Sequence, residues 1–168
     1  VYSELAHIYY DLAPEQESEE EYLQFLNNAS SSFYHSKLLL ENENLVTVSE
    51  KELYSEMWYK YLRSKSYADY KIYEELDTSM IDEIDNLCKF NAKHFGDKDY
   101  KTACSYYLKA LFNKDKDPEL SYEYNMTCAL LFSEIEYVKE DLDDYSLNSP
   151  LDLYSGKWAL MAYNDIMS

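Results

Sequence analysis

The stretch that decides the fold reads DKDYKTACSYYLKALF over residues 97–112 and continues as NKDKDP to residue 118. Aromatic and small side chains recur in it at intervals of three and four residues, at Tyr100, Ala103, Tyr107, Ala110 and Leu111. This spacing places them on one face of an α-helix, which we expect to span residues 97–112. Small side chains on such a face let a neighbouring helix approach closely.

Helix ends are marked on both sides of this stretch. Before it, residues 78–95 form an expected long helix whose apolar side chains recur at three and four, and Gly96 is suited to end it. After it, Asp117-Pro118-Glu119 is a strong helix start. Two helices joined by a tight turn, with this aromatic and small pattern on the second, resemble a tetratricopeptide-type hairpin. An ordinary amphipathic pair stays open as the alternative.

The N-terminal half also reads as helices. We expect one over residues 1–13, with Leu5, Ile8 and Leu12 on its apolar stripe and Pro14 at its end. Ser18 caps the next, over 18–26; a polar stretch at 27–32 then separates it from a short helix at 33–41. A short extended link over residues 45–48 and a capping box, Ser49 with Glu52, lead into a helix to Leu62, followed by a Tyr-rich segment at 67–76.

Further helices are expected over residues 135–147 and 150–167, which makes about nine in all. Short links and paired helices predict an all-α protein of stacked helical hairpins, arranged as a tetratricopeptide-like right-handed solenoid. We expect a single helical-repeat domain over residues 1–168. Its N-terminal hairpins occupy about 1–76, and its tetratricopeptide-like hairpins occupy about 78–168.

Composition narrows the function. The chain has 33 Asp and Glu against 15 Lys and Arg, a formal charge of −18, and Arg63 is its only arginine. Nucleic acids and anionic membranes are bound mainly through basic residues, so direct binding to either is not expected. With 46% hydrophobic residues and 20 tyrosines, the chain has enough apolar surface for a folded core. Neither a signal peptide nor a membrane span is expected at the start.

Residues that could carry catalysis are few. His7, His35 and His94 fall on separate expected helices, and none has a companion at metal-ligand or nucleophile spacing. Cys88, Cys104 and Cys128 are expected as reduced, buried thiols. We therefore expect no enzyme activity, no catalytic residues, no metal and no cofactor, while the partner-binding residues stay unknown.

Acidic and aromatic residues are both abundant in this chain, and either group could form a surface that binds a partner protein. Dense acidic runs at residues 15–21 and 140–144 are either solvated faces or a docking patch for a basic segment. Aromatic groups at Trp58, Tyr59 and Tyr61, and at Tyr67, Tyr70 and Tyr73, are expected to pack between helices. If a group of them were exposed, it would indicate a partner surface.

Several short segments occur in an order that carries a family resemblance. They are YLQFL at 22–26, KLL at 37–39, EMWYKYL at 56–62, CKF at 88–90, DYKTA at 99–103, YL at 107–108, EDL at 140–142, SPL at 149–151 and KW at 157–158. In this order the chain resembles the subunit e family of eukaryotic translation initiation factor 3, in its helical region ahead of the PCI module. The connections at 67–76, 96–99 and 149–158 depart from the family in length, and a complete PCI and winged-helix module is not seen.

The resemblance implies a non-catalytic, cytoplasmic scaffold subunit of initiation factor 3. It also implies contacts with other subunits, d, c and l in particular, and with the small ribosomal subunit, through proteins rather than RNA. A subunit of a sister PCI complex, the proteasome lid or the signalosome, is the first alternative. A tetratricopeptide-like adaptor for basic peptides is the second.

Overall fold

The computed structural model describes residues 2–73 and 77–134, and these residues form six α-helices, two short 3-10 helices and no strand. The all-α class is therefore confirmed for this part of the chain. The fold divides into two compact units, with the boundary in the sequence between Met80 and Ile81, and each is described by itself. The expectation of a single domain over residues 1–168 stays a prediction.

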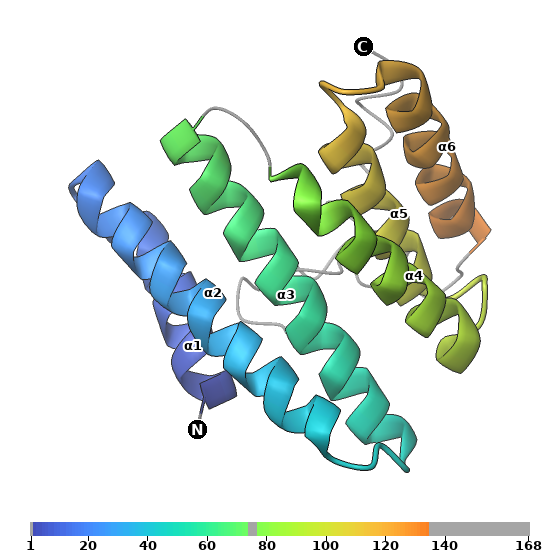
Figure 1. The fold of residues 1–168 in the computed structure, drawn as a ribbon, viewed down its shortest axis with the longest axis horizontal. Helices are drawn as coiled ribbons and strands as arrows, with labels where there is room; N and C mark the ends of the chain where they lie inside the picture. The colour runs from blue at the N-terminus through green and yellow to red at the C-terminus, as the bar shows by residue number, and fades with distance from the viewer. Residues whose placement is uncertain (1, 74–76, 135–168) are drawn as a thin grey trace. The chain divides into compact units, whose positions relative to one another are not determined.

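The first unit is built from three helices that follow one another in the chain (Figure 1). They are α1 (Tyr2–Leu12), α2 (Glu19–Asn42) and α3 (Val48–Tyr73), with the 3-10 helices η1 (Ala13–Glu15) after α1 and η2 (Thr78–Met80) at the end of the unit. α2 packs against both α1 and α3. The core of the first unit contains one cluster of buried residues, Ala6, Ala29, Phe33 and Met57, and a second cluster, Ala13, Leu26 and Ala68.

The apolar stripe expected on α1 faces outward. Leu5, Ile8 and Leu12 are all exposed, whereas Ala6 of α1 and Ala13 of η1 are buried. The reason is packing distance, because the small Ala side chains let α1 approach α2 closely while rings from both helices fill the sides. Tyr9 of α1, for example, meets Phe25 of α2 edge to face at 5.6 Å.

The prediction of a break between two helices at residues 27–32 is wrong, because α2 continues through these residues without interruption. The stretch NNASSS contains no Gly or Pro, and Ala29, Ser30 and Ser32 are buried. Small side chains at a close helix contact outweigh their modest intrinsic helix propensity. The N-terminal cap of the same helix is confirmed: the Glu21 backbone N–H donates to Ser18 Oγ at 3.2 Å, with Glu19, Glu20 and Glu21 in the first turn.

The capping box lies two residues earlier than expected. Thr47, rather than Ser49, accepts from the Glu50 backbone N–H at 3.2 Å, and the Glu50 carboxylate accepts from the Thr47 N–H at 2.8 Å. These hydrogen bonds lower the pKa of Glu50. α3 consequently begins at Val48, which was expected in an extended link, and continues through the Tyr-rich segment as far as Tyr73.

The second unit contains α4 (Ile81–Phe95), α5 (Tyr100–Asn113) and α6 (Pro118–Glu134), with α5 packed against both neighbours. Gly96 has a φ of +104°, so a glycine does end α4 as predicted. α5 starts two to three residues later than expected, because Asp99 caps it and accepts from the Lys101 N–H at 2.8 Å. The start of α6 is confirmed by the Leu120 N–H, which donates to Asp117 at 3.0 Å.

The pattern on α5 faces its two neighbouring helices. Ala103, Tyr107 and Ala110 are buried, whereas Tyr100 and Leu111 are half-buried. Asn91 of α4 donates to the Lys101 carbonyl and to Ser105 Oγ, at 3.1 and 2.9 Å. From the other side, Ser121 of α6 donates to the Ala110 carbonyl at 2.7 Å. The helices expected over residues 135–147 and 150–167 lie outside the described residues.

Candidate functional site

A charged cluster in the core of the first unit joins α1 to α3. Lys60 of α3 is buried, with 1% of its surface exposed, and its ammonium contacts Glu56 one turn earlier and His7 of α1. His7 Nε2 lies 3.7 Å from the Glu56 carboxylate, and the His7 ring meets Phe33 edge to face at 5.3 Å. These residues therefore connect all three helices of the unit.

The Ser3 carbonyl indicates that Nδ1 of the His7 ring carries a proton. Nδ1 lies 2.6 Å from the Ser3 carbonyl oxygen, which can only accept a hydrogen bond, so Nδ1 carries the proton. Nε2 lies 2.5 Å from the Lys60 ammonium, so the His7 ring and the Glu56 carboxylate both contact this buried positive charge.

The carboxylate of Glu56 is held ionised by this cluster. Burial acts to raise its pKa, but the contact with His7 and the charge and hydrogen bond of Lys60 outweigh that effect, so the pKa is lowered. A lysine paired in this way is a structural cation, and the cluster orients α1 on α3.

Other lysines lie in the core between aromatic rings. Lys37 of α2 is buried, 4.7 Å from the centre of the Trp58 ring, with Glu41 at 3.4 Å. Lys101 of α5 lies 4.1 Å from the Tyr100 ring centre and 4.4 Å from that of Phe95. Such cation–π contacts contribute about 0.5–2 kcal/mol each, more as water is excluded.

This use of lysine was missed in the sequence, where the lysines were considered only in the charge balance. One signal could have found it: Lys60 stands in EMWYKYL, and Lys101 directly follows Tyr100. A lysine inside an aromatic helical run is favourably placed to bury its stem and stack its ammonium.

The aromatic groups singled out in the sequence lie mostly inside. Trp58 and Tyr59 are buried, and Tyr61 is half-buried against Tyr34, with ring centres 5.0 Å apart. The expected packing role is therefore observed for these residues. The side chains of Tyr67, Tyr70 and Tyr73 lie outside the described set.

All three cysteines are buried free thiols. Burial raises the pKa of Cys88, raises that of Cys104 well above its usual range, and raises that of Cys128 to about 12. Because the thiolate is the reactive form, these side chains act as small apolar groups in the second unit.

The remaining histidines lie apart from this cluster. His35 is exposed on α2, where its Nδ1 lies 2.7 Å from the Ser31 carbonyl and its ring stacks on Tyr2. His94 of α4 lies against Phe90, with ring centres 4.5 Å apart. Within residues 2–73 and 77–134, no three His, Cys, Asp or Glu side chains are grouped in a way that could hold a metal ion.

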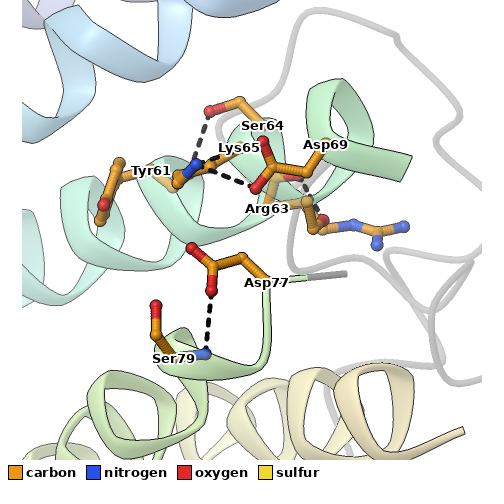
Figure 2. A network of polar contacts seen from close by, with 8 residues as sticks. Tyr61, Arg63, Ser64, Lys65, Asp69, Asp77 and Ser79 are labelled. Atoms are coloured by element: carbon orange, nitrogen blue, oxygen red, sulfur yellow. Dashed lines mark hydrogen bonds and ion pairs between the residues drawn. The ribbon is translucent and has the colours of Figure 1, made fainter. Parts of the chain in front are cut away.

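A second polar group lies at the C-terminal end of α3 (Figure 2). Lys65 forms an ion pair with Asp69 one turn later, at 2.9 Å, and Ser66 Oγ donates to the Arg63 carbonyl at 2.7 Å. Asp77 accepts from the Ser79 backbone N–H at 2.9 Å, and the hydrogen bonds from Ser79 lower the pKa of Asp77. These contacts organise a helix end and a turn; Arg63 itself is buried.

The acidic run at residues 15–21 is on the surface, where Glu15, Glu17, Glu19, Glu20 and Glu21 are all exposed. The run at 140–144 lies outside the described residues. No helix that the structure describes has the length and apolarity needed to cross a bilayer. Comparison with protein-family models, with curated proteins and with solved structures returned no match to this chain.

Proposed function

We propose that this chain is a non-catalytic scaffold subunit of the eukaryotic translation initiation factor 3 complex, related to subunit e. The observation that carries the proposal is the order of short segments from YLQFL at 22–26 to KW at 157–158. The helical architecture is compatible with it, since each helix in each unit packs on the next along the chain. The finer arrangement, a right-handed tetratricopeptide-like solenoid, is part of this proposal.

In this proposal the chain acts through its shape and through its contacts with partner proteins. Helices that are already packed present their side chains to a partner with little further ordering, which leaves more of the contact energy for binding. In this proposal the charged clusters, such as Lys60 with Glu56 and His7, act as structural supports between helices. We place it in the cytoplasm, in contact with subunits d, c and l and with proteins of the small ribosomal subunit.

Affinity purification of the tagged full chain under mild salt tests this function. Initiation factor 3 subunits or small ribosomal subunits should co-purify, and mass spectrometry of the eluate identifies them. Recovery of proteasome-lid or signalosome subunits in their place would move the chain to a sister PCI complex.

One observation favours a second function, an adaptor for basic peptides. Acidic side chains are exposed along residues 11–21, whereas several basic ones are buried. Titration of the chain with pools of basic and acidic peptides, combined with the affinity purification, separates the two functions. An adaptor binds the basic pool and is recovered without initiation factor subunits, whereas a scaffold subunit is recovered with its complex.

A further inference from the structure

An exposed row of apolar side chains runs along α1. Tyr2, Leu5, Ile8 and Leu12 are 48, 38, 53 and 38% exposed, and their spacing of three, three and four residues places them on one face. Apolar residues at helical spacing normally face a core. Here the opposite face of α1, with Ala6, is the one buried against α2.

An acidic row lies directly beside it. Glu4 and Asp11 are exposed and two turns apart, and at 100° per residue both fall next to Ile8 on the helix surface. Exposed Glu15 and Glu17 continue the negative charge past the end of α1. Residues 1–21 hold seven acidic side chains and no Lys or Arg.

This surface is presented by a helix that is held in place. Ala6 and Ala13 pack closely on the inner side, and His7 is anchored to Lys60 and Glu56 of α3. A partner that covers the row therefore has little ordering of α1 left to bring about.

We propose that the outer face of α1 docks an amphipathic helix of a partner protein. That helix carries apolar residues at i, i+3, i+4 and i+7 and a row of Lys or Arg along one edge. Its apolar stripe covers Leu5, Ile8 and Leu12, and its basic edge lies over Glu4 and Asp11. The inference rests on the proposed scaffold function, for which it names a surface and a partner chemistry.

The negative charge beside this face disfavours two other occupants, a second copy of this chain and a membrane surface. A second copy of this chain brings the same seven acidic residues, so two α1 faces repel each other. Membrane-surface helices carry Lys and Arg beside their apolar face, and an anionic bilayer repels the acidic row. A basic helix satisfies both the apolar and the charged parts of the surface.

The test uses the full chain and labelled synthetic peptides of about five helical turns, roughly 18 residues. The first peptide has Leu along one face and Lys along its edge, the second replaces Lys by Glu, and the third has the first composition in scrambled order. Fluorescence anisotropy should show binding of the first peptide that weakens with added salt, no binding of the second, and at least about tenfold weaker binding of the third.

Two variants locate the surface. Ile8→Gln should weaken binding of the Leu/Lys peptide by about tenfold or more, because a central apolar contact is lost. Leu130→Gln changes a leucine that is 58% exposed on α6 and should leave binding unchanged. Circular dichroism of both variants checks that the helices persist.

Equal binding of the scrambled peptide, or an equal loss in Leu130→Gln, overturns the proposal, because attraction to a generally acidic surface would then suffice. Concentration-dependent dimerisation that Ile8→Gln abolishes, or binding to anionic vesicles, reassigns the face and overturns it as well. The peptide assay is independent of complex membership. If the peptide binds specifically but no factor subunits co-purify, the scaffold function is disproved and the docking surface stands. If factor subunits co-purify with wild type and with Ile8→Gln alike, and the peptide does not bind, the docking surface is disproved and the scaffold function stands.

Discussion

At the scale of single residues, Lys60 and Glu56 are expected to respond very differently to substitution. Glu56→Ala leaves the buried ammonium without its carboxylate, which costs about 3–5 kcal/mol of the free energy of unfolding. Lys60→Met keeps a similar length and removes the buried charge, and Glu56 is open enough to regain water, so we expect a loss below about 2 kcal/mol. Urea unfolding followed by circular dichroism measures both losses.

Glu52→Ala, on the exposed side of the same helix, is the matched control and should change stability by no more than about 0.5 kcal/mol. The assignment of Lys60 as a paired structural cation is wrong if Lys60→Met costs more than Glu56→Ala. In that case the ammonium itself would be the group on which the packing depends.

The lowered pKa of Glu56 gives a pH dependence with a definite sign. A carboxyl whose pKa is lower in the folded than in the unfolded chain stabilises the fold above the unfolded value of about 4.5 and loses this effect as the pH falls through its folded value. The difference in unfolding free energy between wild type and Glu56→Gln should therefore shrink between about pH 7 and about pH 3. A difference that stays constant over this range contradicts the ionised pairing.

The three buried thiols should differ in their reactivity in the folded chain. Cys104 and Cys128 have no exposed surface and raised pKa values, so iodoacetamide labelling near pH 8 should await unfolding, while Cys88, slightly exposed, should react first. Mass spectrometry of labelled peptides checks the order in which the thiols react, and fast labelling of Cys128 in the native chain contradicts its burial.

The raised pKa of Cys128 also predicts how stability changes at high pH. The unfolded Cys128 thiol ionises near pH 9 and the folded one near pH 12, so the free energy of unfolding should fall as the pH rises above about 9.

At the scale of elements, the cap of α3 offers a direct comparison between two neighbouring sites. Thr47→Ala removes the hydroxyl that accepts from the Glu50 N–H and should cost about 1 kcal/mol of unfolding free energy. Ser49→Ala, in the capping box expected from the sequence, should cost no more than about 0.5 kcal/mol, because Ser49 is an exposed residue already inside the helix. Thermal unfolding of both variants measures the difference, and a larger loss for Ser49→Ala would restore the expected register.

Local punctuation was predictable because its physics is contained within one helical turn. Ser18, Gly96 and Asp117 each act on backbone groups three or four residues away, so the sequence near them is sufficient. The lengths of α2 and α3 were not predictable in this way. The stretch NNASSS at 27–32 reads as a loop by polarity, yet its small side chains allow close packing between helices, a relation visible only across the fold.

The candidate site depended on longer distances still. His7 and Lys60 are 53 residues apart in sequence, and nothing in either local context links them. On α1 the sequence located a stripe at helical spacing but not what that stripe faces. Periodicity identifies a face of a helix but does not say what covers it, and Ala6 and Ala13 took the inner position because α1 lies close to α2.

At the scale of the whole molecule, the described surface is more acidic than composition alone indicates. Lys37, Lys60, Arg63 and Lys101 are buried, whereas Asp69 is the one acidic residue buried among those the structure describes. Positive charge is thus drawn into the core, beside aromatic rings and carboxylates, and negative charge is left in the solvent. This distribution supports the proposal of basic protein partners rather than nucleic acid.

The same distribution predicts that salt stabilises the fold. Raising sodium chloride from about 0.01 to about 0.15 M shortens the Debye length from about 30 to about 8 Å, which screens repulsion between exposed acids while buried pairs are screened less. Each kcal/mol of repulsion relieved should raise the Tm by about 2–4 °C in a chain of this size. Differential scanning calorimetry at several salt concentrations measures the slope.

The slope should come from surface acids, and one variant tests that origin. Neutralising Asp11→Asn, Glu15→Gln and Glu17→Gln together removes three exposed charges next to α1, so the variant should start with a higher Tm at low salt and gain less from added salt. A Tm that falls with salt would mean that ion pairs such as Lys65–Asp69 outweigh the repulsion. An unchanged slope in the variant would place the repulsion elsewhere on the chain and remove the electrostatic argument for a basic partner at α1.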